Sequence, residues 1–131
     1  MFLDASAVVA ILGLEEGWEL LESKAAGSPG NLVSALAVYE SVLGLERKLS
    51  CGLQEAQTAV DNFLREAGAM TVPIDAAIGM EAIGAHARFR KGRHRASLNM
   101  GDCFAYACAK MHRVPLLCKG DDFVHTDIRI A

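Results

Sequence analysis

Several acidic residues of this sequence occur where an isolated charge is unfavourable. Asp102 lies at the start of a predicted helix, in the run LNMGDCFAYACAK, and apolar residues follow it closely. Glu40 lies in SALAVYESVLGLERK, and its neighbours three and four positions away are Leu36, Ala37, Leu43 and Gly44. An ionised carboxylate on an apolar helix face is costly unless it is paired, protonated or bound to a metal ion. Both acids are therefore candidates for a functional role.

Further acidic residues follow two of the predicted strands. Asp4 comes directly after MFL, and Asp121 and Asp122 come shortly after VPLLC. The carboxyl ends of parallel strands share one edge of a sheet, where ligands bind, so we expect these acids to meet there. Each acid also has an ordinary explanation. Asp102 can cap its helix, Glu40 can form a salt bridge, and the Asp121–Asp122 pair can belong to a turn.

A divalent cation explains these acids as a set. Most basic residues that could neutralise them lie at 88–95, so three or four converging carboxylates would repel one another. A ligand set of oxygens without His or Cys favours Mg²⁺ or Mn²⁺ over zinc. Such an ion suits hydrolysis of a phosphodiester bond, because it lowers the pKa of a water and neutralises phosphate charge. Ser6 and Asn99 can orient water or a ligand from just outside the metal ligands.

The elements that must position these residues alternate between short apolar strands and helices. Strands are predicted at MFL, NLV, AMTVPI, VPLLC and TDIRI. Helices are predicted at 4–12, 15–26, 34–49, 53–68, 75–89 and 99–112. Continuous apolar strands separated by helices are typical of a parallel sheet that is covered on both faces. The expected fold class is therefore α/β, with a short central parallel sheet in a three-layer α/β/α sandwich.

Length and composition limit the class of protein. The 131 residues are enough for one domain, expected to span 1–131, and 52% hydrophobic with 22% charged residues is typical of a globular protein. No stretch is long enough to span a membrane, and no basic segment precedes the apolar start, so we expect a cytoplasmic protein without a membrane partner. The four cysteines form no CxxC pair and are expected to be reduced and mostly buried.

Positive charge is concentrated in one segment although the net charge is −3. Five of the thirteen basic residues lie in the eight positions 88–95, and the segment 88–97 is predicted to form an exposed loop. Such a loop beside an acidic site can hold an RNA backbone while the acids hold metal. The candidate RNA-binding residues are Arg90, Lys91, Arg93 and Arg95. The same segment could instead dock an acidic protein partner or be a solvated loop.

Four stretches of the chain resemble the PIN domain, and most closely the VapC-type toxins of bacterial toxin–antitoxin systems. They are MFLDASAVVAIL, SALAVYE, GRHRASLNMGDCFAYACAK and PLLCKGDDFVHTDI, which follow one another in the expected order and spacing, so that the resemblance extends over essentially the whole chain. The resemblance implies an α/β/α sandwich whose acidic Mg²⁺ or Mn²⁺ site hydrolyses RNA. It also implies a cognate antitoxin that binds the toxin and blocks the site, and a homodimer.

The resemblance also implies roles for individual residues. The catalytic and metal-binding acids are Asp4, Glu40 and Asp102, and Ser6 matches the small hydroxyl residue after the first aspartate. The fourth acid is Asp121 or Asp122. We favour Asp121, which leaves Asp122 beside the ligands.

Two other functions compete with a ribonuclease. One is a catalytically inactive PIN-like protein that binds nucleic acid or acts as a scaffold, which is disfavoured because no acid of the motif set is missing. The other is a receiver-like phosphoacceptor domain, to which Lys119 would contribute. A receiver needs an acidic pair after its first strand, and this chain offers only Asp4 there.

Overall fold

Four parallel strands form a single sheet in the order β3-β2-β1-β4. The computed structural model describes all residues, 1–131. Its strands are β1 (Phe2–Leu3), β2 (Asn31–Ser34), β3 (Ala69–Val72) and β4 (Leu116–Leu117). Phe2 pairs with Leu32 on one side and with Leu116 on the other, so the first strand of the chain lies inside the sheet. The predicted parallel sheet is confirmed.

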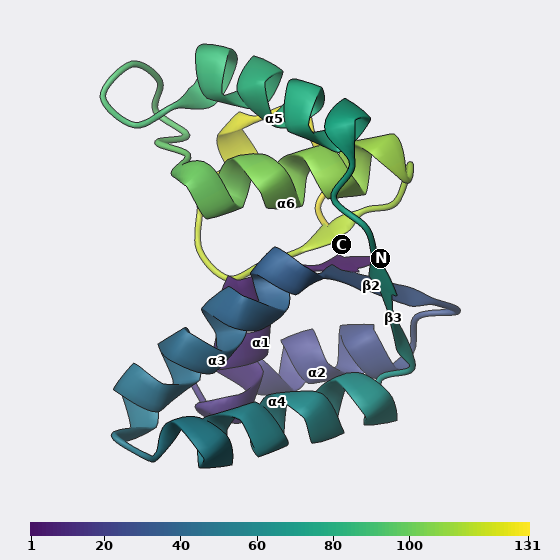
Figure 1. Ribbon diagram of the computed structural model, residues 1–131, viewed down its shortest axis with the longest axis vertical. Coiled ribbons are helices and arrows are strands. Elements are labelled where there is room, and N and C mark those ends of the chain that lie inside the picture. Colours follow the sequence, from purple (N-terminus) through teal and green to yellow (C-terminus); the bar gives the residue numbers. More distant parts are fainter.

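Helices cover both faces of this sheet. On one side lie α1 (Ala5–Leu12), α2 (Trp18–Ala26), α3 (Ala35–Leu49) and α4 (Leu53–Glu66), and on the other lie α5 (Ala76–Phe89) and α6 (Met100–Met111) (Figure 1). Helices α1 and α3 pack together, as do α5 and α6. A short 3-10 helix, η1 (Phe123–His125), follows β4. The three-layer α/β/α sandwich expected from the sequence is confirmed.

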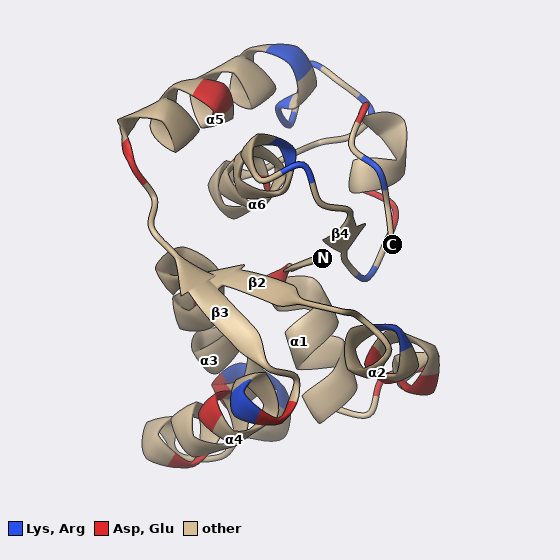
Figure 2. Cartoon of the chain, turned by 90° about the vertical axis from the view of Figure 1, so that its right-hand side faces the viewer, with Lys and Arg blue, Asp and Glu red and all other residues tan.

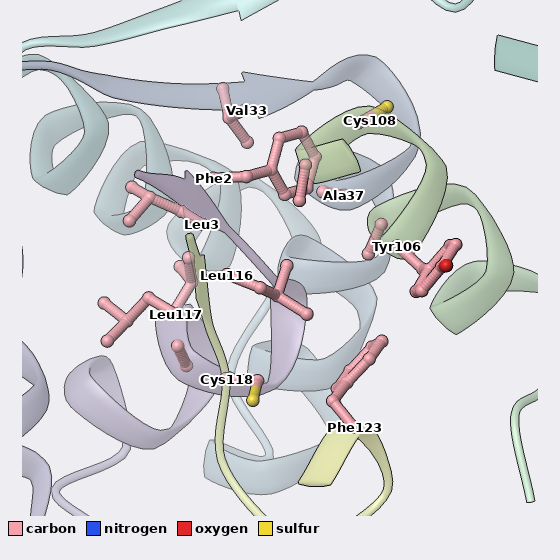
Figure 3. Packing of buried hydrophobic residues seen from close by; sticks show 14 of the residues in the cluster. Phe2, Leu3, Val33, Ala37, Tyr106, Cys108, Leu116, Leu117, Cys118 and Phe123 are labelled. Atoms are coloured by element: carbon pink, nitrogen blue, oxygen red, sulfur yellow. The ribbon is translucent and has the colours of Figure 1, made fainter. Parts of the chain in front are cut away.

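The core lies between the sheet and its two helical layers. The four residues of β1 and β4 are almost fully buried, as are Tyr106 and Cys108 of α6 (Figure 3). Strands that are buried on both faces are continuously apolar, which explains why they are readable from so few residues. The strand ends, and the acids that follow them, are thereby fixed relative to the helices.

Asn31, the first residue of β2, is a buried polar residue that joins two helix ends. Its side chain is 0% exposed, and Nδ2 donates to the carbonyl of Ala25 at 2.9 Å and of Ala67 at 2.8 Å. These carbonyls belong to the last turn of α2 and to the residue that caps α4. Since helix ends leave carbonyls without intrahelical donors, Asn31 adds a hydrogen bond to each of these carbonyls, of which Ala25 also accepts from the amide of Ser28 at 3.3 Å.

The strand predicted at TDIRI is wrong. Only an isolated bridge joins Ile130 to Leu116. The hydroxyl of Thr126 donates to the carbonyl of Phe123 at 2.7 Å and accepts from the amide of Ile128 at 3.3 Å. These local hydrogen bonds turn the chain after η1, in competition with a regular strand.

Charged residues of both signs lie on the outer helices α2 and α4, whereas β2 and β3 carry none (Figure 2). The C-terminal end of α5 is basic and leads into the loop before α6. None of the helices combines the length and the apolar character that crossing a lipid bilayer would require.

Candidate active site

Asp4 is the most deeply buried acid of the candidate set. It lies where β1 ends, caps the N-terminus of α1 and is only 4% exposed. Its Oδ2 accepts from the amide of Ser6 at 2.9 Å and from the Ser6 hydroxyl. The same hydroxyl accepts from the backbone amide of Lys119 at 3.0 Å. Ser6 therefore links the acid after β1 to the loop after β4, as a positioning residue.

Asp102 and Asn99 hold each other at the start of α6. The Asn99 side chain accepts from the amide of Asp102 at 3.0 Å, and the Asp102 carboxylate accepts from the amide of Asn99 at 2.8 Å. In this reciprocal capping box Asn99 is the N-cap, and Asp102 contributes to capping from the third helical position, so its expected capping role is confirmed in this form. Asp102 sits in the first turn, where it favours helix formation and keeps one oxygen free for other partners.

Glu40 of α3 reaches across to α6 and packs on Gly101. A Cβ atom placed on Gly101 would lie 2.5 Å from Oε2 and 2.6 Å from Cδ of Glu40, far inside van der Waals contact. Only a glycine at 101 admits the carboxylate here, beside Asp102. This role of Gly101 was not predicted from the sequence, although a glycine next to a candidate acid at a helix start is a visible signal.

The electrostatics show that three acids share one region. Burial raises the pKa of Asp4, and the hydrogen bonds from Ser6 oppose that shift. Burial also raises the pKa of Glu40, and the negative charges of Asp4 and Asp102 raise it further. Burial raises the pKa of Asp102 to about 6, against the hydrogen bond from Asn99 and with the help of Asp4. The charge of Asp4 thus makes ionisation of both Glu40 and Asp102 harder.

The structure brings Asp122, rather than Asp121, into this group. The charge of Asp122 contributes to the raised pKa of Asp4 and of Asp102, whereas that of Asp121 contributes to neither. It also contributes to the raised pKa of the Cys118 thiol, which burial and the nearby acids lift to about 12. Both aspartates are exposed in the loop before η1. The assignment of Asp121 as the fourth acid stays a prediction, and the electrostatic influence of Asp122 makes it the alternative.

The residues fit a divalent cation by their chemistry. The donors are carboxylate oxygens, and none of the four ion pairs of the structure includes Asp4, Glu40, Asp102 or Asp122. No three acidic, His or Cys side chains lie at distances that would hold an ion as they stand. Binding one ion through three or more of these side chains would therefore require the carboxylates to move inward, and neutralising their repulsion would favour that movement.

The basic segment divides into a fixed and a free part. Arg88, in the last turn of α5, donates to the Tyr106 hydroxyl at 2.7 Å and pairs with Asp127 at 3.3 Å. The remaining basic residues, Arg90, Lys91, Arg93 and Arg95, form no ion pair and lie in the loop between α5 and α6. The expected loop thus begins after Arg88 and Phe89, which belong to α5.

Comparison with known proteins agrees with this fold. Residues 1–129 match the PIN domain family. The chain is 41% identical to "VapC ribonuclease R02377" of Rhizobium meliloti, over 97% of this chain and 98% of that protein. It is 40% identical to "Ribonuclease VapC" of Mycolicibacterium smegmatis, over 98% of this chain and 97% of the relative. The chain therefore belongs to the PIN domain family, and its relatives there are VapC-type ribonucleases.

A solved structure supports the fold independently of close sequence similarity. It is described as "Toxin-antitoxin complex from Klebsiella pneumoniae", and it superposes with a TM-score of 0.70 over 99% of this chain and 95% of its own. The two sequences are only 14% identical, so the comparison speaks for the fold alone.

Proposed function

We propose that this protein is a VapC-type toxin that hydrolyses RNA in the cytoplasm with Mg²⁺ or Mn²⁺. The observation that carries the proposal is the placement of Glu40 on Gly101, beside Asp102 and within the electrostatic reach of buried Asp4, with no basic side chain paired to any of the three. Relatives of nearly the same length are named as ribonucleases.

The acids divide the work of the site. Asp4, Glu40 and Asp102 would hold the cation, and Asp122 is the better candidate for a fourth carboxylate, with Asp121 next to it in the loop. A bound Mg²⁺ or Mn²⁺ supplies a water of lowered pKa and offsets the charge of the phosphate. Ser6 fixes the position of Asp4 relative to the loop after β4, because its hydroxyl is hydrogen-bonded to both. Asn99 orients Asp102.

The free basic residues would hold the RNA backbone. Lys91, Arg93 and Arg95 are exposed and Arg90 is half-buried, in a loop that leads directly to the cap of α6. Phosphate contacts of this kind attract RNA without regard to sequence. The chain would thus place basic side chains that bind the RNA backbone next to the acidic side chains that bind the metal ion.

A protein partner follows from the same assignment. The structural neighbour is described as a toxin–antitoxin complex, and we extend an antitoxin partner to this chain. The homodimer implied by the resemblance stays a prediction, which the molar mass in solution tests.

Replacement of single acids tests the proposal. Asp4→Asn and Asp102→Asn are expected to abolish Mg²⁺-dependent cleavage of RNA and the Mg²⁺-induced rise in melting temperature, while circular dichroism stays that of the wild type. Asp61→Asn, on the exposed face of α4, is the matched control and should cleave normally. Wild-type cleavage by either site variant would refute the assigned site. A wild-type protein that binds RNA without cleaving it would favour the inactive PIN-like alternative.

A further inference from the structure

A cavity of about 420 Å³ lies between α5 and α6, next to the acidic site. Ligand pockets span about 300–1,000 Å³, so the cavity is large enough for a small ring system. Most of its walls are apolar, with side chains from both helices and the intervening loop, and they include Ala82, Ile83, Leu98 and Phe104. His86 adds a second aromatic ring.

The cavity and the acidic site share a residue. Asn99 lines the cavity, and its backbone amide donates to the carboxylate of Asp102. A molecule bound in the cavity would therefore contact a residue that is hydrogen-bonded to Asp102, one of the acids that would hold the metal. Cys103, the neighbour of Asp102 along α6, lines the cavity as well.

Positive charge borders the same cavity. Arg90 and Lys91 line it, and neither forms an ion pair. The amide of Lys91 donates to the carbonyl of Leu98 at 3.2 Å, and the amide of Leu98 donates to the carbonyl of Phe89 at 3.0 Å. These backbone hydrogen bonds close the base of the loop, so the two cations stay at the cavity.

We infer that this cavity receives one unstacked base of single-stranded RNA, while Arg90 and Lys91 hold the adjoining phosphates. The inference rests on the proposed function and adds to it a place where the substrate is held. Aromatic and apolar surfaces beside a basic groove are how proteins bind single strands, because every base has a face that can stack. Single-stranded RNA is thereby selected over a duplex, whose bases are already stacked.

A second copy of this chain is a poorer occupant of the cavity. A symmetric dimer through this face would place Arg90 and Lys91 of both copies in one interface, and the residues that line the cavity include no carboxylate to neutralise them. An RNA strand instead offers a flat base that fits the apolar walls and phosphates whose negative charge complements Arg90 and Lys91.

Gly79→Leu tests the inference by filling the cavity. Gly79 lines the cavity within α5, and a Cβ atom placed on it meets nothing within 4 Å, so the helix should accept the side chain. Gly84→Leu is the matched control, because Gly84 lies in the same helix with equally open space and does not line the cavity. Ile83→Glu, at a cavity residue that is 63% exposed, is a second variant that keeps the fold.

The probe is a short labelled single-stranded RNA, compared with versions that carry one abasic residue, in EDTA to prevent metal-dependent cleavage. We expect one abasic version to bind the wild type about tenfold more weakly, which corresponds to about 1.4 kcal/mol. Gly79→Leu and Ile83→Glu should bind intact RNA about as weakly as the wild type binds that abasic version, and removing the base should weaken their binding no further. Gly84→Leu should behave as the wild type.

Two results would overturn the inference. One is wild-type RNA affinity in both cavity variants, and the other is a fall in molar mass of Gly79→Leu from dimer to monomer, which would assign the cavity to a second copy. Cleavage of RNA by the wild type with Mg²⁺ is measured separately. Normal cleavage with unaffected cavity variants refutes the base pocket alone, whereas absent cleavage refutes the proposed function.

Discussion

Gly101→Ala is expected to inactivate the enzyme with little effect on stability. The added Cβ would lie 2.6 Å from Cδ of Glu40, whereas carbon atoms in contact are about 3.5 Å apart, so the carboxylate must withdraw by about 1 Å. Glu40 is half-buried and long, and its end can rotate away without moving α3 or α6. A displacement of about 1 Å at a reacting centre can cost about a hundredfold in rate.

The assay compares Mg²⁺-dependent RNA cleavage with the melting temperature. We expect cleavage to fall about a hundredfold while the melting temperature stays close to that of the wild type. Gly84→Ala, where a Cβ meets nothing within 4 Å, is the control and should keep full activity. The shorter Glu40→Asp should cost less in the Gly101→Ala background than in the wild type, because the clash has already displaced the carboxylate. Cleavage by Gly101→Ala at the wild-type rate would refute the assignment of Glu40 to the site.

Three further predictions follow from the geometry. Because burial and nearby acids raise the pKa of Asp102 to about 6, protonation favours the folded state, and this contribution is present below about pH 4 and lost as the pH rises through about 6. In EDTA the melting temperature should therefore fall as the pH rises from about 4 to above 6, and it should fall less in Asp102→Asn. The rise in melting temperature that Mg²⁺ causes should grow over the same pH range. A Mg²⁺ effect that is independent of pH would argue against Asp102 as a ligand. Asn31→Leu should lower the free energy of unfolding by about 2 kcal/mol in urea titrations, because the Ala67 and Ala25 carbonyls each lose a hydrogen bond, although Ala25 still accepts from the amide of Ser28, and an unchanged stability would show that water replaces the side chain. Replacing Arg90, Lys91 and Arg93 with Gln should reduce the slope of log Kd for single-stranded RNA against log salt by about 2, and an unchanged slope would assign the loop to another partner.

The sequence was most informative where both faces of an element are buried. The strand β1 and the helix α6 are recognisable because their apolar residues are continuous or periodic, and Asp4 and Asp102 mark their ends. Asn99 was placed beside Asp102 from spacing alone, and the capping box supports that placement. Helix α2 begins three residues later than expected, at Trp18, after the left-handed backbone of Gly17 (φ 81°).

Contacts between distant segments were beyond the reach of the sequence. The packing of Glu40 on Gly101 joins α3 to α6 and depends on the distance between two helices. The difference between Asp121 and Asp122 depends on how a loop turns, and adjacent aspartates look alike in a sequence. The final segment has the apolar alternation of a strand, but the hydroxyl of Thr126 turns the chain there.

The order of the strands controls when the site can exist during synthesis. β1 is synthesised before the other three strands, whereas its neighbour β4 and the loop carrying Asp122 are synthesised after them. The amide of Asp4 donates to the carbonyl of Leu117 at 3.0 Å, so the first acid reaches its final position only when the last strand has left the ribosome. A nascent chain therefore carries no complete set of acids, and a protein that destroys RNA would spare the message from which it is being translated.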